Sequence, residues 1–171
     1  MRSAVLWTCG LLLIRTVAAG QAASDSAKAI LQDANGKKVG EATLEETPHG
    51  VLVNLSLMGL PAGVHAFHIH ETGKCEPPFA TAGGHFNPGG KKHGLKSAEG
   101  MHAGDMPNLD IPESGTLRAQ VLVAGVTLKP GANSLLDADG SALVIHAGPD
   151  DYATDPTGNA GGRIACGVVT K

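Results

Sequence analysis

Short stretches of alternating apolar and polar residues run through most of this chain. In residues 51–57 every second position is valine or leucine, and residues 117–123 repeat the pattern with leucine, alanine and valine. Side chains two apart on a β-strand point to the same face, so both stretches predict strands with one buried face.

Other short segments lie between turn residues and predict further strands. An Asn-Gly pair at residues 35–36 is a strong hairpin signal between two of them. Strands are expected at 27–32, 39–45, 142–146 and 163–170, and around His68. The chain shows no helical period and no internal repeat, so about eight short strands predict an all-β antiparallel sandwich or barrel in one domain.

His68 and His70 stand two residues apart in the segment Phe-His-Ile-His. On a strand they project from one face, while Phe67 and Ile69 point to the opposite face. Two imidazoles on one face make half of a metal chelate, and imidazole suits zinc and copper.

Further candidate ligands follow in a segment rich in glycine, proline and lysine. They are His85, His93, His102 and Asp105. That composition predicts a long loop, able to fold back over the strand of His68. One carboxylate among three imidazoles suits a tetrahedral zinc site, so the set of candidate ligands predicts two metal ions.

Seven ordered motifs between about residue 27 and the C-terminus resemble the copper/zinc superoxide dismutase family. They are Phe-His-Ile-His (67–70), Gly-His-Phe-Asn-Pro (84–88), Lys-His-Gly (92–94), His-Ala-Gly-Asp (102–105), Leu-Val-Ile-His (143–146), Gly-Pro-Asp-Asp (148–151) and Gly-Asn-Ala-Gly-Gly-Arg-Ile-Ala-Cys-Gly (158–167). The resemblance implies a Greek-key antiparallel β-barrel with two long functional loops, at about 71–110 and 147–162. The insertion at 74–84 is similar to that of bacterial members, which implies a periplasmic enzyme.

The resemblance also implies a ligand set for each metal. The copper ligands would be His68, His70, His85 and His146. The zinc ligands would be His85, His93, His102 and Asp105. His85 would then bridge both ions as an imidazolate. A histidine that only satisfies a hydrogen bond is the alternative for each position, and we expect that role for His65.

Two residues near the C-terminus resemble residues that support the metal site. Asp150 would accept hydrogen bonds from one histidine of each set and fix their tautomers. Arg163 would hold superoxide beside copper through charge-assisted hydrogen bonds. The alternatives are an exposed loop acid and a surface arginine. The second long loop has no lysine or arginine, so Lys91, Lys92 and Lys96 of the first loop are candidates for steering the substrate, with plain solvation as the alternative.

The implied activity is the dismutation of superoxide to dioxygen and hydrogen peroxide. Copper would cycle between two oxidation states, and the catalytic residues would be Arg163 and the zinc-supported His85. A secreted copper- and zinc-binding module without turnover is the alternative, and such a module would be expected to lack His146 or Arg163. A nucleophilic hydrolase is poorly supported, because no serine or cysteine lies in a nucleophile motif.

Residues 1–22 have the order of a secretory signal peptide rather than a membrane anchor. Arg2 precedes an apolar run that ends at Arg15, and small residues follow. Residues 23–171 would then form the mature domain. Of the three cysteines, Cys75 and Cys166 remain after cleavage, and an oxidising compartment favours a disulfide between them over two free thiols.

The net charge of −3 gives no reason to expect nucleic acid or an anionic membrane as a partner. Superoxide is itself an anion, so local positive charge at the site has to outweigh the charge of the whole protein. The sequence leaves open whether the protein is a monomer or a homodimer.

Overall fold

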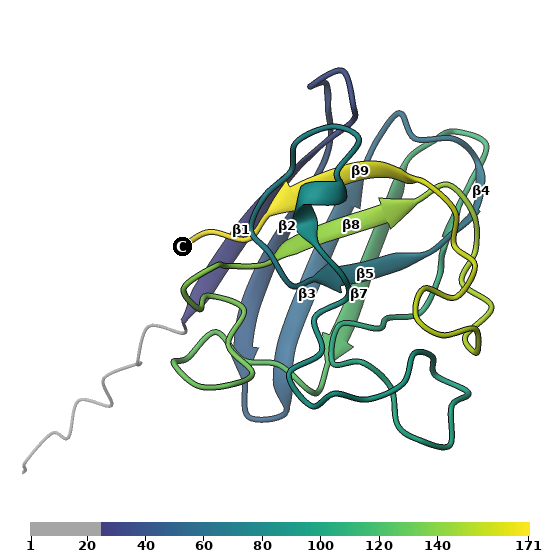
Figure 1. The fold of residues 1–171 in the computed structure, drawn as a ribbon. Coiled ribbons are helices and arrows are strands. Elements are labelled where there is room, and N and C mark those ends of the chain that lie inside the picture. Colours follow the sequence, from purple (N-terminus) through teal and green to yellow (C-terminus); the bar gives the residue numbers. More distant parts are fainter. Residues whose placement is uncertain (1–24) are drawn as a thin grey trace, which may run out of the picture.

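In the computed structural model, which describes residues 25–171, nine β-strands and one turn of 3₁₀ helix are connected by loops (Figure 1). The strands are β1 (Ser26–Gln32), β2 (Lys38–Thr47), β3 (Gly50–Leu57), β4 (Gly63–His65), β5 (Phe67–His70), β6 (Leu109–Ile111), β7 (Leu117–Val123), β8 (Ala142–His146) and β9 (Arg163–Val168). The 3₁₀ turn, η1, spans Ala80–Ala82.

Seven of these strands form one curled antiparallel sheet in the order β5-β8-β9-β1-β2-β3-β7. The remaining two, β4 and β6, pair with each other as a second sheet. In this order β1, β2 and β3 are neighbours, as are β8 and β9, whereas β5 and β7 form the two opposite edges of the sheet. The predicted all-β antiparallel fold with two long loops is confirmed.

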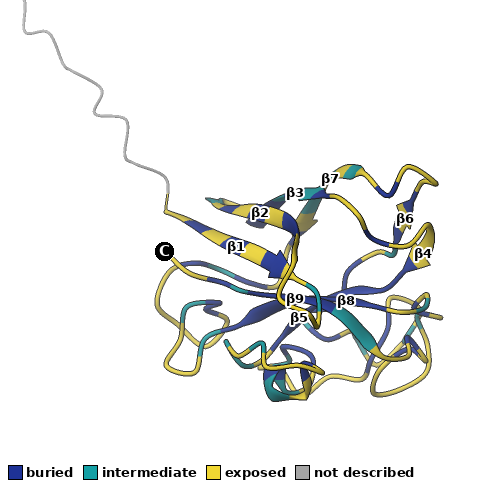
Figure 2. Cartoon of the chain, turned by 90° about the horizontal axis from the view of Figure 1, so that it is seen from above, coloured by how far each residue is buried: buried dark blue, intermediate teal, exposed yellow. Residues whose placement is uncertain are grey.

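The inner face of the curled sheet carries the alternating apolar residues found in the sequence. In β1–β3 every second residue is buried, with Leu31, Leu44 and Val53 fully enclosed. Burying such a side chain contributes about 1.5–3 kcal/mol relative to leaving it in water. The alternation is visible in Figure 2, where β1 and β2 are striped in blue and yellow.

In contrast, β5 and β8 are buried on both faces, and Figure 2 shows them dark blue throughout. Phe67, Ile69 and Leu143 lie in the main core. Val144, on the opposite face of β8, packs in a second apolar cluster with Phe79 of the first long loop. The loops therefore cover the outer face of these two strands, and His68 and His70 project into this covered space.

Two strands were not predicted, because β4 and β6 have only three residues each and show too little alternation to detect. The first loop consequently ends at Asn108, two residues earlier than expected. Residues 1–22, the predicted signal peptide, lie outside the described residues. Within residues 25–171 no helix has the length and apolar character needed to cross a membrane.

Candidate metal centre

The fold brings together all seven predicted metal ligands in two groups that share one histidine. The all-histidine cluster consists of His68, His70, His85 and His146. The carboxylate cluster consists of His85, His93, His102 and Asp105. Every member is buried, and within each group the potential ligand atoms lie within 4.8 Å of one another.

Backbone pairing fixes the first long loop against the free edge of β5. His70 forms an isolated β-bridge with His85, and His68 forms one with Asp105. Between them the N–H of Ile69 donates to the carbonyl of Gly104 at 2.9 Å. Each histidine of β5 is therefore aligned by main-chain bonds with a ligand from the loop, so the site does not depend on side-chain contacts alone.

Gly104 is required at this crossing. A Cβ atom there would strike the carbonyl oxygen of Ile69 and lie 3.1 Å from the backbone nitrogen of Phe86. The glycine lets the loop approach β5 closely enough to bring Asp105 beside His68.

The carboxylate cluster has the dimensions of a zinc site. The Oδ1 atom of Asp105 lies 2.8, 3.1 and 3.2 Å from the Nδ1 atoms of His85, His93 and His102. The Nδ1 atoms of His85 and His102 are 3.3 Å apart. Ligands at zinc bond lengths in a tetrahedron are separated by about 3.3 Å. Three imidazole nitrogens and one carboxylate oxygen therefore fit a tetrahedral zinc ion.

In the all-histidine cluster, hydrogen bonds on the far side of the rings leave one nitrogen of each ring facing inward. His70 Nδ1 lies 3.0 Å from the carbonyl oxygen of Gly83, and His146 Nδ1 lies 3.3 Å from that of Gly161. A carbonyl only accepts, so each Nδ1 carries the proton and each Nε2 keeps its lone pair. These two Nε2 atoms are 3.3 Å apart.

The other two histidines of this cluster each hold a buried nitrogen without a hydrogen-bond partner among the described residues. These atoms are Nδ1 of His68 and Nε2 of His85. A buried nitrogen without a partner is costly, which makes it a strong indication of a missing ligand. A donor set of four imidazoles suits copper, so these residues fit the metal that the sequence predicted.

Burial keeps three imidazoles of the all-histidine cluster neutral. Burial, with a smaller contribution from the positive charge of Arg163, lowers the pKa of His70 to about 2. Burial and the neighbouring His68 lower the pKa of His146 to about 3. Burial also lowers the pKa of His68. These rings therefore hold no extra proton at neutral pH and are ready to bind a metal.

The carboxylate of Asp105 is held ionised against the effect of burial. Burial alone would raise its pKa, but hydrogen bonds from the His85 ring and the Gly94 N–H outweigh burial and lower that pKa below its usual range. The cluster thus combines three imidazoles with one negative charge.

Asp150 connects the two clusters from behind, as the resemblance implied. Its Oδ2 atom lies 2.8 Å from Nε2 of His68, and its Oδ1 atom lies 3.0 Å from Nε2 of His93. The carboxylate accepts a hydrogen bond from the Nε2–H of each ring. The Nδ1 atom of each ring is therefore free to face its metal position. Gly158 is needed here, since a Cβ atom would strike Asp150 and lie 2.6 Å from the His93 ring.

Asn108 was not predicted from the sequence, and it fixes the main chain of Asp150. Its side-chain amide donates to the Asp150 carbonyl at 2.9 Å and accepts from the Asp150 N–H at 2.8 Å. The backbone N–H of Asn108 also donates to the hydroxyl of Tyr152 at 2.7 Å. No sequence signal identifies Asn108, because its partners lie more than forty positions away along the chain.

The predicted disulfide between Cys75 and Cys166 is present, with the two Cα atoms 5.6 Å apart. It joins the first loop to β9, the strand that begins with Arg163. The guanidinium donates to the carbonyls of Phe79 and Gly83 at 2.6 Å each. Gly83 is the residue whose carbonyl also accepts from His70, so one carbonyl holds Arg163 and His70 together.

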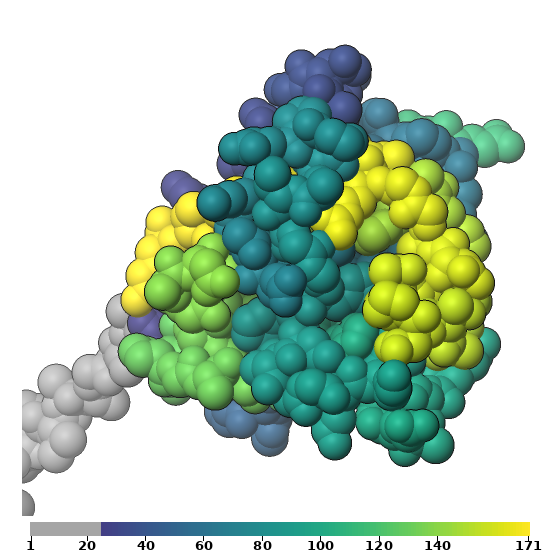
Figure 3. Space-filling model, in the orientation of Figure 1, coloured from purple at the N-terminus to yellow at the C-terminus, as the bar shows by residue number. Residues whose placement is uncertain are grey.

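The second loop engages two of the lysines that were candidates for steering. Lys92 forms an ion pair with Asp155 at 3.0 Å. Lys96 lies over the ring of Tyr152, 5.4 Å from its centroid. Figure 3 shows the two loops, in teal and yellow, side by side on one face of the molecule. Arg163 is the cation whose charge acts on His70 and His146.

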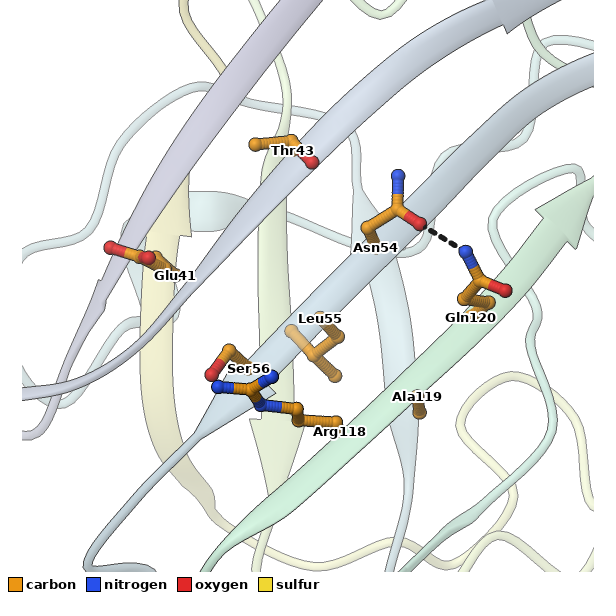
Figure 4. A pocket seen from close by; sticks show the side chains of 8 residues that line it. All are labelled: Glu41, Thr43, Asn54, Leu55, Ser56, Arg118, Ala119 and Gln120. Carbon is orange, nitrogen blue, oxygen red and sulfur yellow. Dashed lines mark hydrogen bonds between the residues drawn. The ribbon is translucent and has the colours of Figure 1, made fainter.

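A separate hollow of about 590 Å³ lies on the outer face of β2, β3 and β7 and shares no residue with either cluster. Figure 4 shows Asn54 and Gln120 joined by a hydrogen bond and Arg118 lying over Ser56. Small side chains such as Thr43 and Ser56 leave this open depression between longer ones, and we assign it no chemistry.

Comparison with known proteins agrees with this geometry. The family model for copper/zinc superoxide dismutase matches residues 38–169. "Superoxide dismutase [Cu-Zn] 2" of Aquifex aeolicus is 58% identical over 146 residues, covering 84% of this chain and 85% of that protein. "Superoxide dismutase [Cu-Zn]" of Caulobacter vibrioides is 45% identical over 148 residues, covering 84% and 85%. The crystal structure of a double mutant of a SOD-like protein from Bacillus subtilis superposes with a TM-score of 0.81 at 41% identity, covering 84% of this chain and 97% of that one.

The lowered histidine pKa values predict that the metal-free protein loses stability in acid. In the unfolded chain His70 and His146 titrate near 6.5, but in the fold only near 2 and 3. Below pH 6.5 the unfolded chain therefore binds protons that the fold excludes. Each histidine should lower the free energy of unfolding by about 1.4 kcal/mol per pH unit between these limits. Urea titrations of the metal-free protein from pH 7 to pH 4 measure this slope.

A double variant with His70→Gln and His146→Gln is the control for this prediction. It should show a smaller fall in stability over the same pH range. An equal slope in both proteins would show that these two histidines do not cause the acid sensitivity.

Replacing Asn108 with alanine should weaken zinc binding, because Asp150 would no longer be held behind His93. Loss of such a supporting partner costs about 10–100-fold in metal affinity. Competition with a chromogenic chelator measures the affinity, and Asn54→Ala, which removes another hydrogen-bonded amide from the sheet surface, serves as the control. Zinc affinity within twofold of the unsubstituted protein would contradict the role given to Asn108.

Proposed function

Because the chain belongs to the copper/zinc superoxide dismutase family, we propose that its two clusters are the copper site and the zinc site of that activity. Copper is assigned to His68, His70, His85 and His146. Zinc is assigned to His85, His93, His102 and Asp105. The protein is an enzyme that converts superoxide to dioxygen and hydrogen peroxide, and its cofactors are copper and zinc.

The observation that carries the assignment is the orientation of the His85 ring. Its Nδ1 atom lies in the carboxylate cluster, 2.8 Å from Asp105, while its Nε2 atom is buried without a partner in the all-histidine cluster. A single ring thus presents one nitrogen to each metal position. Because Nδ1 faces Asp105, Nε2 is the atom at which His85 can hold and pass on a proton.

Copper, when bound, supplies a one-electron redox couple, which zinc lacks. The protein's own residues supply the rest. The imidazoles of His68, His70 and His146 are kept neutral by burial, so they can bind a metal without first losing a proton. Asp150 fixes the rings of His68 and His93. The protons for hydrogen peroxide can pass through Nε2 of His85, because that nitrogen has no other partner among the described residues.

Arg163 is proposed to bind the superoxide anion. The guanidinium is half-buried, and its two terminal nitrogens are held by the carbonyls of Phe79 and Gly83. The carbonyl of Gly83 also accepts from His70, so Arg163 lies beside a residue assigned to copper, and its charge lowers the pKa of that ring. A fixed cation in this position attracts an anion into a protein whose net charge is negative.

A binding module without turnover is the competing interpretation. Such a module would need the same two clusters but no side chain that binds superoxide. The two hydrogen bonds and the disulfide that fix Arg163 favour an enzyme, since metal storage gives no use for an immobilised cation beside copper.

We also propose that the protein is secreted to the periplasm. Residues 1–22 have the composition of a signal peptide, and the disulfide between Cys75 and Cys166 is of a kind that persists in oxidising compartments. Mass spectrometry of the N-terminus of the protein recovered from a periplasmic extract would test this location.

Replacing His146 with alanine should abolish copper retention and superoxide removal, while about one zinc per chain remains bound. The reason is that His146 contributes only to the all-histidine cluster. Metal analysis and an activity assay on the same samples give the answer, with His49→Ala, at an exposed turn, as the control. Activity that survives the loss of His146 would refute the copper assignment.

Replacing Arg163 with alanine should lower kcat/KM by about tenfold or more, because the positive charge that attracts superoxide to the site is removed. Copper and zinc content should stay unchanged. Arg163→Lys keeps the charge and should recover part of the rate, with a salt dependence closer to that of the original enzyme. Pulse radiolysis at several ionic strengths measures both effects, and an unchanged rate in the alanine variant would exclude the proposed role.

A further inference from the structure

A groove of about 570 Å³ lies between the end of β7 and the first long loop. Three of the six large apolar residues that are exposed in the described chain line this one groove: Leu122 (52% exposed), Leu95 (40%) and Met101 (39%). Met106 and Pro107 add further apolar surface. A concentration of exposed apolar side chains in one hollow marks a place where another molecule binds.

One wall of the groove is the edge of a β-strand. β7 is the last strand of the seven-stranded sheet and pairs with β3 alone. Val121, Leu122 and Val123 all line the groove, although consecutive residues of a strand point to opposite faces. The groove therefore meets the strand at its edge rather than on one face.

The backbone at this edge is available for pairing. Among the described residues, the backbone of Leu117–Val123 forms no hydrogen bond except within the ladder to β3. Every second residue of an edge strand turns its N–H and C=O outward. β7 has no proline, no lysine and no bulge, and its one charged residue, Arg118, lies at the other end of the strand from the groove.

We propose that this groove binds an extended segment of another protein, which adds to β7 as a further strand. Strand addition joins main-chain hydrogen bonds along the edge with contacts for alternate side chains. The opposite wall is formed by residues of the first loop between Asn87 and Pro107, so an added strand would lie between the edge of β7 and this loop.

The charges of the lining define the chemistry of that segment. Its charged residues are Lys91 and Asp105, and Asp105 is buried and turned toward three histidines. Lys91 is exposed, and its ammonium group forms no ion pair within residues 25–171. The segment should therefore carry apolar residues at alternate positions and one acidic residue that reaches Lys91. This inference does not depend on which metals occupy the site.

The probes are acetylated and amidated peptides of seven residues, the length of β7. Valine alternates with threonine, and glutamate replaces one threonine at each position in turn. Binding to the copper- and zinc-loaded protein is measured by fluorescence anisotropy of a labelled peptide. Saturable binding is expected for at least one peptide, together with slower hydrogen exchange at those amides of β7 that point away from β3.

Two variants and a matched control tie the binding to the groove. Leu122→Glu should weaken binding by about tenfold or more, because burying a leucine contributes about 1.5–3 kcal/mol. Met58→Glu, at a position of equal exposure outside the groove, should leave binding unchanged. Lys91→Glu should reverse the charge preference, so that peptides with lysine in place of glutamate bind more tightly.

Four results would overturn the proposal. The first is no saturable binding of any peptide up to about 1 mM, a concentration that corresponds to only about −4 kcal/mol. The second is equal weakening by Leu122→Glu and Met58→Glu. The third is binding of decanoate without peptide binding, which would identify a site for small amphiphiles. The fourth is concentration-dependent dimerisation that Leu122→Glu abolishes, which would give the groove to a second copy of the chain.

Discussion

The burial of six imidazoles and one carboxylate against each other is the constraint on which the rest of this structure depends. Polar side chains removed from water are costly unless each nitrogen and oxygen has a partner. Most of these atoms are satisfied by carbonyls, by Asp105 or by Asp150, but one nitrogen each of His68 and His85 is not. Both nitrogens face the all-histidine cluster, so a metal ion bound there would relieve an unfavourable arrangement and stabilise the fold.

The two long loops must be as rigidly attached to the sheet as its own strands are, because they carry several of the buried imidazoles and both aspartates. The first loop is bonded to β5 through its backbone, and the disulfide joins it to β9. The second loop is held by Asn108 and by the hydrogen bond between its Asp150 and His93 of the first loop. Each attachment lies behind a ligand or behind Arg163. The rigidity of the site thus comes from the elements that also cover β5 and β8 and keep water away from them.

Much of the candidate site could be predicted from the sequence because the residues that form its two clusters come in short, ordered motifs. The spacing of His68 and His70 predicts that both lie on one face of a strand. The two ligand sets and the roles of Asp150 and Arg163 were predicted from the resemblance to a known family, and the disulfide from the even pair of cysteines. The strands of the main sheet were predictable because their alternation is regular. Asn108 was missed because its role is set by distant partners. β4 and β6 were missed because three residues are too few to show a period. The groove beside β7 depends on which strand ends the sheet, and no local pattern reveals that.

The central claim is that His85 lies between two different metals and contributes one nitrogen to each. X-ray diffraction from crystals of the copper- and zinc-loaded protein, recorded on both sides of the copper and zinc absorption edges, tests this claim directly. The account predicts a copper peak beside Nε2 of His85, within reach of His68, His70 and His146, and a zinc peak beside Nδ1, within reach of Asp105. A single metal peak, or two peaks that do not lie on opposite sides of the His85 ring, would contradict it.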